Sequence, residues 1–348
     1  MTSINITERL RKGRQIDREQ HKEGEVHKLG TLRAGTGGIM ADNGDVAGGC
    51  VRKAHLRSLG IEIEEPDDGK LIMFQLGYAN EDVLYKDLIK TSAPDEVLLR
   101  EEEIPIEWQT SNGTRVTGRP DVVICSVSER ESPTAIRRET PAKDTVYFYK
   151  PEVGLELKSV HSVWVARDVL FGKQPKLTNL IQAGHYMWKL GIPYRLIYKG
   201  YSSLGQGMAW SDKMASMFPR QGEPGSEWME YNDRGKPKQV KQFEVVYELE
   251  LDRHGRIMYR EENATGERAA PWKKSLATTA DIERYYEYVS QMESSKQLGP
   301  RPLTLDAHGS RLNYTDCSYC PLQETCDKYE DKGYDTWLKQ VRKLAVVK

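Results

Sequence analysis

The order of the periodic segments in the first two thirds of this sequence limits its fold more than any other feature. Two segments carry apolar residues at helical spacing, and four carry the alternation of strands. The helices are expected at 71–89 and 176–190, and the strands at 97–108, 114–125, 153–160 and 193–200. Helices interspersed with strands in this order predict an α/β fold, with a mixed central sheet flanked by helices.

The flanking segments complete this outline. Residues 1–47 are polar, charged and glycine-rich, and are expected to form a flexible N-terminal segment. Residues 48–330 are expected to form one domain, with an insertion around 202–240, and residues 331–348 a C-terminal tail. Smaller elements are expected as a short helix at 50–59, a loop at 126–144, a hairpin at 243–262 and a helix at 280–293 with Ile282, Tyr285, Tyr286, Val289 and Met292 on one face.

Bulk properties exclude several classes of protein. The 348 residues carry a net charge of −1, so any contact with nucleic acid must come from local patches. No apolar run approaches the roughly 20 residues of a membrane span, and the N-terminus lacks the apolar stretch of a secretory signal. We therefore expect a cytoplasmic, intracellular protein without a membrane partner, whose five cysteines are reduced or bound to metal.

Two carboxylates and a lysine are predicted to meet on the sheet. The motif GRPD (118–121) is expected inside the second strand of the first hairpin, and ELK (156–158) in the next strand. Alternation places Glu156 and Lys158 on one face, and Asp121 can share that face if the strands are neighbours. Such oxygen ligands hold Mg²⁺ or Mn²⁺, and a lysine beside them suits phosphodiester hydrolysis. An ExK triplet alone is more often a solvated ion pair.

A polar pair on the second helix adds to this set. Gln182 and Tyr186 are separated by one helical turn, so their side chains project from the same face. They can bind a phosphate or a metal-bound water, or they can be ordinary helix surface.

Three cysteines near the C-terminus are predicted to bind metal. Cys317, Cys320 and Cys326 follow the spacing C-x₂-C-x₅-C, and three thiolates need a fourth ligand. Cys50 is the candidate, whereas Cys125 is expected to be a small buried residue beside the first site. Zinc and a [4Fe–4S] cluster both accept four thiolates, and the spacing leaves both open.

The motifs GRPD, ELK and QxxxY, in this order, resemble the RecB-type branch of the PD-(D/E)xK nucleases. The resemblance implies that Asp121 and Glu156 bind the metal ion, that Leu157 lends its carbonyl and that Lys158 assists the attacking water. It makes Gln182 and Tyr186 part of the catalytic set. The family carries a His or Glu after a Gly on its first core helix. The matching position in Gly77-Tyr-Ala-Asn-Glu81 is Glu81, so this sequence has no histidine there and the resemblance makes Glu81 a further metal ligand.

The cysteines resemble those of two cluster-binding groups, the AddB-type helicase–nucleases and the CRISPR-associated adaptation nucleases. This likeness covers roughly residues 48–330. It implies a [4Fe–4S] cluster on Cys50, Cys317, Cys320 and Cys326, within a subdomain formed by both chain ends. The implied role of the cluster is structural.

The resemblance implies a Mg²⁺- or Mn²⁺-dependent DNA exonuclease of recombination, repair or phage DNA processing. The alternatives are a nuclease that trims ends in CRISPR spacer acquisition and an inactive DNA-binding module on the same fold. The implied partners are DNA and a helicase, recombinase or integrase. Two sets of residues are candidates for DNA contact or for ordinary solvated surface: Arg52, Lys53 and Arg57, and Trp164, Arg167, Lys173 and Lys176. The histidines His161 and His185 are further candidates.

Overall fold

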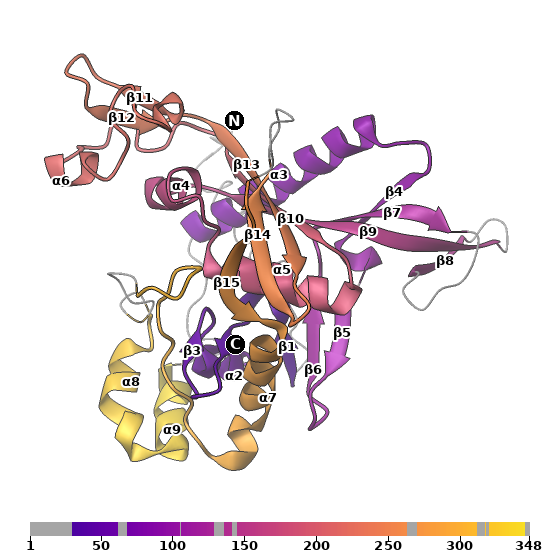
Figure 1. Cartoon of the computed structure of the whole chain (residues 1–348). Coiled ribbons are helices and arrows are strands. Elements are labelled where there is room, and N and C mark those ends of the chain that lie inside the picture. Colours follow the sequence, from indigo (N-terminus) through magenta and orange to yellow (C-terminus); the bar gives the residue numbers. More distant parts are fainter. Residues whose placement is uncertain are drawn as a thin grey trace, which may run out of the picture.

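A computed structural model describes residues 30–61, 68–104, 106–128, 136–140, 145–262, 270–311, 317 and 320–344. Its centre is a large mixed sheet in the order β15-β14-β13-β10-β9-β7-β4, with β8 paired to β9 (Figure 1). The strands are β4 (Glu96–Arg100), β7 (Val122–Ser128), β8 (Ile136–Thr140), β9 (Thr145–Ser159), β10 (Tyr194–Gly200), β13 (Phe243–Leu251), β14 (Arg256–Glu261) and β15 (Lys273–Thr278). β9 and β10 run parallel, and the other neighbours in this sheet are antiparallel. The expected α/β fold with a mixed sheet is confirmed.

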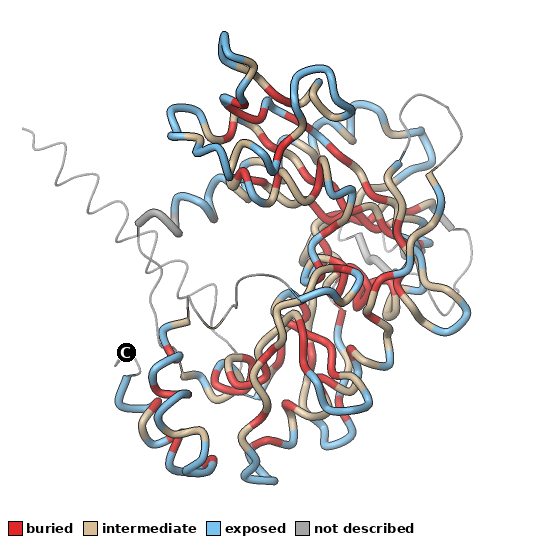
Figure 2. Tube along the Cα trace, turned by 60° about the vertical axis from the view of Figure 1, so that its left-hand side comes forward, coloured by how far each residue is buried: buried red, intermediate tan, exposed pale blue. Residues whose placement is uncertain are grey.

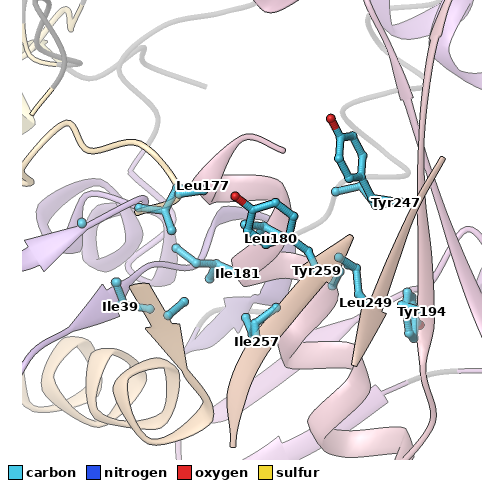
Figure 3. Packing of buried hydrophobic residues seen from close by; sticks show 14 of the residues in the cluster. Ile39, Leu177, Leu180, Ile181, Tyr194, Tyr247, Leu249, Ile257 and Tyr259 are labelled. Atoms are coloured by element: carbon cyan, nitrogen blue, oxygen red, sulfur yellow. The ribbon is translucent and has the colours of Figure 1, made fainter. Parts of the chain in front are cut away.

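Helices α5 (Leu177–Leu190) and α7 (Thr279–Ser295) cover part of this sheet, where α5 contacts β9, β10, β13 and β15. Buried positions run through the strands and the helix faces that meet them (Figure 2). Figure 3 shows Ile181 of α5 beside Ile39 and Ile257 in this core. The five apolar residues expected on one face of α7 are all buried, and Thr278 caps the helix by accepting a hydrogen bond from the Asp281 amide.

A second, smaller core joins the two ends of the described chain. Helix α2 (Val51–Ser58) contributes Leu56, while α8 (Gln323–Tyr329) and α9 (Tyr334–Leu344) contribute the other helical side chains. The cluster includes Trp337, which is fully buried. Figure 1 shows α8 and α9 on the same side of the molecule as α2.

The glycine-rich stretch 30–49 is not the flexible loop that we expected. It forms β1 (Thr31–Arg33), β2 (Ile39–Met40) and β3 (Val46–Ala47), and β1 pairs with β6 (Arg115–Gly118) in a three-stranded sheet completed by β5 (Ile106–Gln109). Its apolar residues are buried in the main core. The glycines permit close packing: a Cβ on Gly37 would lie 2.1 Å from the hydroxyl of Tyr286. Residues 1–29 lie outside the described part.

Three further expectations about strands were wrong. Residues 97–108 split into β4 and β5, which belong to different sheets and flank the 3-10 helix η2 (Glu101–Glu103). Residues 114–125 split into β6 and β7, because Pro120 has no amide to continue the ladder. The expected loop at 126–144 is partly strand, since β7 continues to Ser128 and β8 pairs with an early start of β9; residues 129–135 and 141–144 lie outside the description.

Several other elements complete the fold. Helix α3 (Asp68–Thr91) was expected, and it contacts β9. Helix α4 (Val163–Leu170) was not expected. The insertion around 202–240 holds α6 (Asp212–Ala215) and the pair β11 (Met229–Tyr231) and β12 (Pro237–Val240). In the described ranges no helix combines the length and apolar character that crossing a bilayer requires.

The packing of the glycine-rich stretch makes a prediction about stability. A Cβ on Gly49 would lie 2.6 Å from the carbonyl oxygens of Thr36 and Gly37, which are backbone atoms without room to move. We expect Gly49→Ala to lower the free energy of unfolding by about 1–3 kcal/mol, the usual effect of overpacking. Gly77→Ala is the control, since no atom lies within 4 Å of its added Cβ in α3 and alanine favours helices. Denaturant unfolding measures both, and equal effects would contradict this account.

Candidate active site

Asp121 is fixed at the junction where the chain enters β7, not inside a strand as expected. Val122 pairs with Leu155 of β9, which places Asp121 beside the ELK segment. The carboxylate oxygen Oδ2 of Asp121 accepts a hydrogen bond of 2.7 Å from the amide of Leu157. The interruption between β6 and β7 at Arg119-Pro120 therefore places the Asp121 side chain in contact with β9.

Lys158 is held by groups from two elements. Its Nζ lies 2.5 Å from Oε1 of Glu156, the neighbour on the same face of β9, and donates a 3.1 Å hydrogen bond to Oε1 of Gln182 on α5. Only about a quarter of the Lys158 side chain is exposed. The ammonium group is thus fixed beside the carboxylates.

Gln182 and Tyr186 extend this network, and they share one face of α5 as predicted. The amide Nε2 of Gln182 donates to the Tyr186 hydroxyl at 3.3 Å, and that hydroxyl donates to the carbonyl of Arg119 at 3.2 Å. A Cβ on Gly118 would lie 2.6 Å from the Tyr186 ring, so this glycine permits the close approach. A continuous chain of hydrogen bonds therefore runs from Lys158 back to the GRPD segment.

Glu156 is fully buried, and its second oxygen, Oε2, has no hydrogen-bond partner among the described residues. Burial raises the pKa of Glu156, while the Lys158 charge opposes this rise. Burial and the charge of Glu156 also raise the pKa of Asp121. Burial alone would lower the pKa of Lys158, but attraction to Glu156 and Asp121 outweighs it and raises that pKa. The site is thus a buried pair of carboxyl groups beside a lysine, with one oxygen of Glu156 left without a partner among the described residues.

Glu81 on α3 belongs to the same electrostatic cluster. Burial, and then the charges of Asp121 and Glu101, raise the pKa of Glu81 to about 8, with Lys158 acting in the opposite direction. The side chain of the preceding residue ties α3 to the sheet, since Asn80 Nδ2 donates to the Ser159 hydroxyl at 2.7 Å. The structure therefore directs Glu81 toward the predicted carboxylates.

Glu101, in η2, was missed by the sequence analysis. Its charge contributes to the raised pKa of Glu81, Asp121 and Glu156. The run Glu101–Glu103 looks like a solvated segment of strand in the sequence, and only the turn between β4 and β5 brings Glu101 toward the site.

The donor set fits a hard divalent cation. The carboxylates of Glu81, Asp121 and Glu156 lie within electrostatic range of Lys158. The unpartnered Oε2 of Glu156 is the kind of buried atom that a cation satisfies. Within the described ranges, no three His, Cys, Asp or Glu side chains already stand at metal-ligand spacing. The fit therefore rests on the chemistry of the donors and on this unpaired oxygen.

The two histidines differ in their surroundings. His185 is fully buried, and its Nε2 accepts a 3.0 Å hydrogen bond from Nε1 of Trp108. Burial lowers the pKa of His185 to about 3, so it is a neutral core residue and not the substrate contact considered above. His161 is exposed just before α4, and its partial burial lowers its pKa.

The four predicted cysteine ligands lie around the smaller core. Cys50 immediately precedes α2, Cys326 lies in α8, and the Cys320 amide donates to the Cys317 carbonyl at 3.0 Å. Burial raises the pKa of Cys50, as does the charge of Cys320, while the Lys53 and Arg52 amides lower it. Burial also raises the pKa of Cys317, and Cys320 and Cys326 add to this. Cys50 thus lies within electrostatic range of Cys320, and Cys317 within range of Cys320 and Cys326.

Cys125 is separate from this group. It is fully buried in a third core with Leu99, Ile104 and Val123, and burial raises its pKa to about 12. A bulge between Ile124 and Cys125 interrupts the alternation that the sequence suggested. Cys125 is therefore the small buried residue that we expected.

The candidate DNA contacts are not equivalent. Arg52 is buried, with 2% of its surface exposed, so it is neither a phosphate contact nor solvated surface. Trp164 is 42% exposed at the start of α4, and the Arg167 guanidinium lies 5.5 Å from its ring centre. Lys173 forms an ion pair of 3.5 Å with Glu261.

Comparison of the chain with protein-family models, with curated proteins and with solved structures gives no match.

Proposed function

We propose that this protein is a divalent-metal-dependent deoxyribonuclease of the PD-(D/E)xK type, acting as an exonuclease. The observation that carries the proposal is Lys158, held between Glu156 and Gln182 beside Asp121, with Oε2 of Glu156 left unpaired. Carboxylates that would hold a divalent cation beside a lysine suit the attack of water on a phosphodiester.

The residues that would hold the cation are Asp121, Glu156 and Glu81, with the Leu157 carbonyl as a further oxygen donor. When bound, the cation supplies positive charge to the phosphate and lowers the pKa of a water molecule. Lys158 orients the attacking water and offsets negative charge that develops on the phosphate. Gln182 keeps the ammonium group in place, and Tyr186 fixes Gln182 to the Arg119 carbonyl.

An inactive DNA-binding module is the less favoured function. Burying a lysine and a carboxylate costs free energy that their mutual attraction offsets only in part, and a catalytic role gives a reason for this cost that a binding module lacks. The proposed setting is recombination, repair or phage DNA processing, with a helicase, recombinase or integrase as partner. End trimming in CRISPR spacer acquisition uses the same chemistry and is the second setting.

Labelled DNA tests the proposed activity. Purified protein is incubated with duplex and single strands labelled at the 5′ or the 3′ end, with Mg²⁺, with Mn²⁺ or with EDTA. An exonuclease releases the label from one end at once and shortens the strand progressively, only with metal. Internal fragments of fixed size would show an endonuclease, and intact DNA under all conditions would contradict the proposal.

The supporting role of Gln182 leads to a separate prediction. We expect Gln182→Ala to lower the cleavage rate about 10- to 100-fold, as is usual for residues that orient a metal-site group. Binding of Mn²⁺, measured by calorimetry, should persist because Gln182 contacts Lys158 and Tyr186 and is not proposed as a ligand. Asn179→Ala is the control on the same helix, since Asn179 bonds Tyr198. Complete loss of Mn²⁺ affinity in Gln182→Ala would show that this role is wrong.

For the second site we propose that Cys50, Cys317, Cys320 and Cys326 bind one [4Fe–4S] cluster, with zinc as the alternative. Four thiolates suit either metal centre. The support is the electrostatic proximity of the sulfurs and the packing of α2 against α8 and α9. A centre at this place joins the start of the described chain to its end, which is a structural role.

A further inference from the structure

Trp164, in the first turn of α4, presents a large aromatic surface to solvent although its ring is well supported. The residue is 42% exposed. Its ring lies against that of Phe218, with the two centres 6.2 Å apart, and the Arg167 guanidinium lies 5.5 Å from its centre. Phe218 is itself buried and packs edge-on against Trp210. The Trp164 ring is therefore held in place while part of it stays open to a ligand.

The support for this ring comes from the insertion around 202–240, to which both neighbouring aromatic residues belong. The insertion packs closely on α4, because a Cβ on Gly205 would lie 2.9 Å from Cγ1 of Val163. Figure 1 shows α4 next to the insertion. The Nη1 of Arg167 donates to the sulfur of Met217 in the insertion, at 3.9 Å. The insertion thus gives the Trp164 ring a fixed position on the protein surface.

Helix α4 follows the strand of the candidate active site almost directly. Strand β9 ends at Ser159, one residue after Lys158, and the Ser159 hydroxyl accepts a hydrogen bond from Asn80, the neighbour of Glu81. Trp164 is six residues after Lys158, so their Cα atoms are at most about 20 Å apart. Stacked nucleotides advance by about 3.4 Å along one strand. A DNA strand with a phosphate at Lys158 can therefore bring a base to Trp164 within about six nucleotides.

The charge of this part of the chain favours a polyanion. Residues 159–190 contain one acidic residue, Asp168, and four basic residues, Arg167, Lys173, Lys176 and Lys189, whereas the whole chain has a net charge of −1. Lys173 and Lys176 are exposed, although Lys173 shares its charge with Glu261. Arg167 bonds Asp168, so it supports the ring more than it attracts phosphate. A strand that passes over α4 thus meets a segment of net positive charge.

We propose that Trp164 stacks on an unpaired base, so that the DNA substrate is single-stranded where it crosses α4. This inference rests on the proposed nuclease function and specifies its substrate. Stacking on an aromatic side chain tolerates any base, but it needs a base face that the neighbours in a duplex do not cover. Trp164 binds the substrate strand in this role and takes no part in the chemistry at Lys158.

Fluorescence anisotropy of a labelled single-stranded oligonucleotide measures this contact on the full-length protein, in EDTA so that no cleavage occurs. Trp164→Ala is expected to raise the Kd about tenfold or more, because it removes the stacking surface. Trp164→Leu, which keeps an apolar contact with Phe218, should have the same effect. Trp164→Phe keeps an aromatic ring and should lose much less. Leu344→Ala on α9 is the control, since Leu344 is similarly exposed, and it should bind like wild type.

Oligonucleotides that lack one base at a time identify the stacked position, because an abasic site keeps every phosphate. For wild type, removal of the stacked base should raise the Kd about tenfold. The same removal should have no further effect on Trp164→Ala, as is expected for two groups in direct contact. Cleavage of the same oligonucleotides after addition of Mn²⁺ should occur within about six nucleotides of that position. Circular dichroism checks that each variant is folded.

The possible failures are distinct. Equal affinity of wild type, Trp164→Ala and Trp164→Leu would overturn the stacking contact, as would losses from Trp164→Ala and the abasic site that simply add. Tighter binding of wild type to blunt duplex than to the single strand would overturn the single-stranded substrate. Intact DNA in Mn²⁺ would overturn the proposed nuclease, while the comparison in EDTA still decides on Trp164. Wild type that binds no single-stranded DNA would overturn the contact as well.

Discussion

Replacement of Glu156 with glutamine is expected to reduce DNA cleavage by at least about a thousandfold, because members of a catalytic unit act together. The Glu156 carboxylate is fully buried between Lys158 and the unpaired position at Oε2, so its charge is required for both the cation and the lysine. Asp121→Asn and Lys158→Ala should have effects of similar size. The fold should persist in Glu156→Gln, since glutamine has the same shape. Single-turnover cleavage of end-labelled DNA measures the rates.

Glu152→Gln provides the matched control for this prediction. Glu152 lies on the same strand, but it is exposed and bonds Ser126 and Lys150. It should cleave DNA at the wild-type rate. A folded Glu156→Gln protein that cleaves DNA almost as fast as wild type would falsify the assignment of the site.

Replacement of Cys50 with serine is expected to have the largest effect on the smaller core. Anaerobically purified wild type should be brown, with broad absorbance near 400 nm, roughly as thiolate-bound iron–sulfur centres show. Cys50→Ser should lose colour and solubility, because the centre would no longer join α2 to the C-terminal helices. Metal and sulfide analysis measures the content, with about four iron atoms per chain expected for the cluster.

Cys125→Ser is the control for the ligand choice. It should remain brown, because Cys125 lies in a separate core with Leu99 and Val123. A buried hydroxyl there costs about 1–3 kcal/mol of stability without affecting the metal. A brown, stable Cys50→Ser beside a colourless Cys125→Ser would contradict the assignment, and zinc without iron would replace the cluster but keep the four ligands.

Periodicity predicted helices α5 and α7, because burial of one helix face leaves a clear pattern, whereas α4 was not expected. The buried face of α7 and the shared face of Gln182 and Tyr186 both follow from residue spacing alone. The pairing of β7 with β9, which places Asp121 against Leu157, required the additional assumption that these strands are neighbours. Motif spacing therefore singled out the candidate site residues, but their contacts with one another could be seen only in the folded chain.

Features that depend on distant contacts were not predictable. The glycines of 30–49 indicated a loop, yet Gly37 and Gly49 permit close packing that only the folded chain reveals. Glu101 was not singled out, because its role depends on the turn between β4 and β5. Arg52 looked like surface because its partners, Gly299 and Glu330, lie near the other end of the chain.

The central claim is that Asp121 and Glu156 hold a divalent cation beside Lys158. Crystals of the protein soaked in Mn²⁺ and measured at a wavelength where manganese scatters anomalously test this most directly. We expect a manganese peak in contact with Oε2 of Glu156 and with the Asp121 carboxylate, next to the Lys158 ammonium group. A protein that binds Mn²⁺ elsewhere, with Oε2 of Glu156 still unpaired, would contradict it.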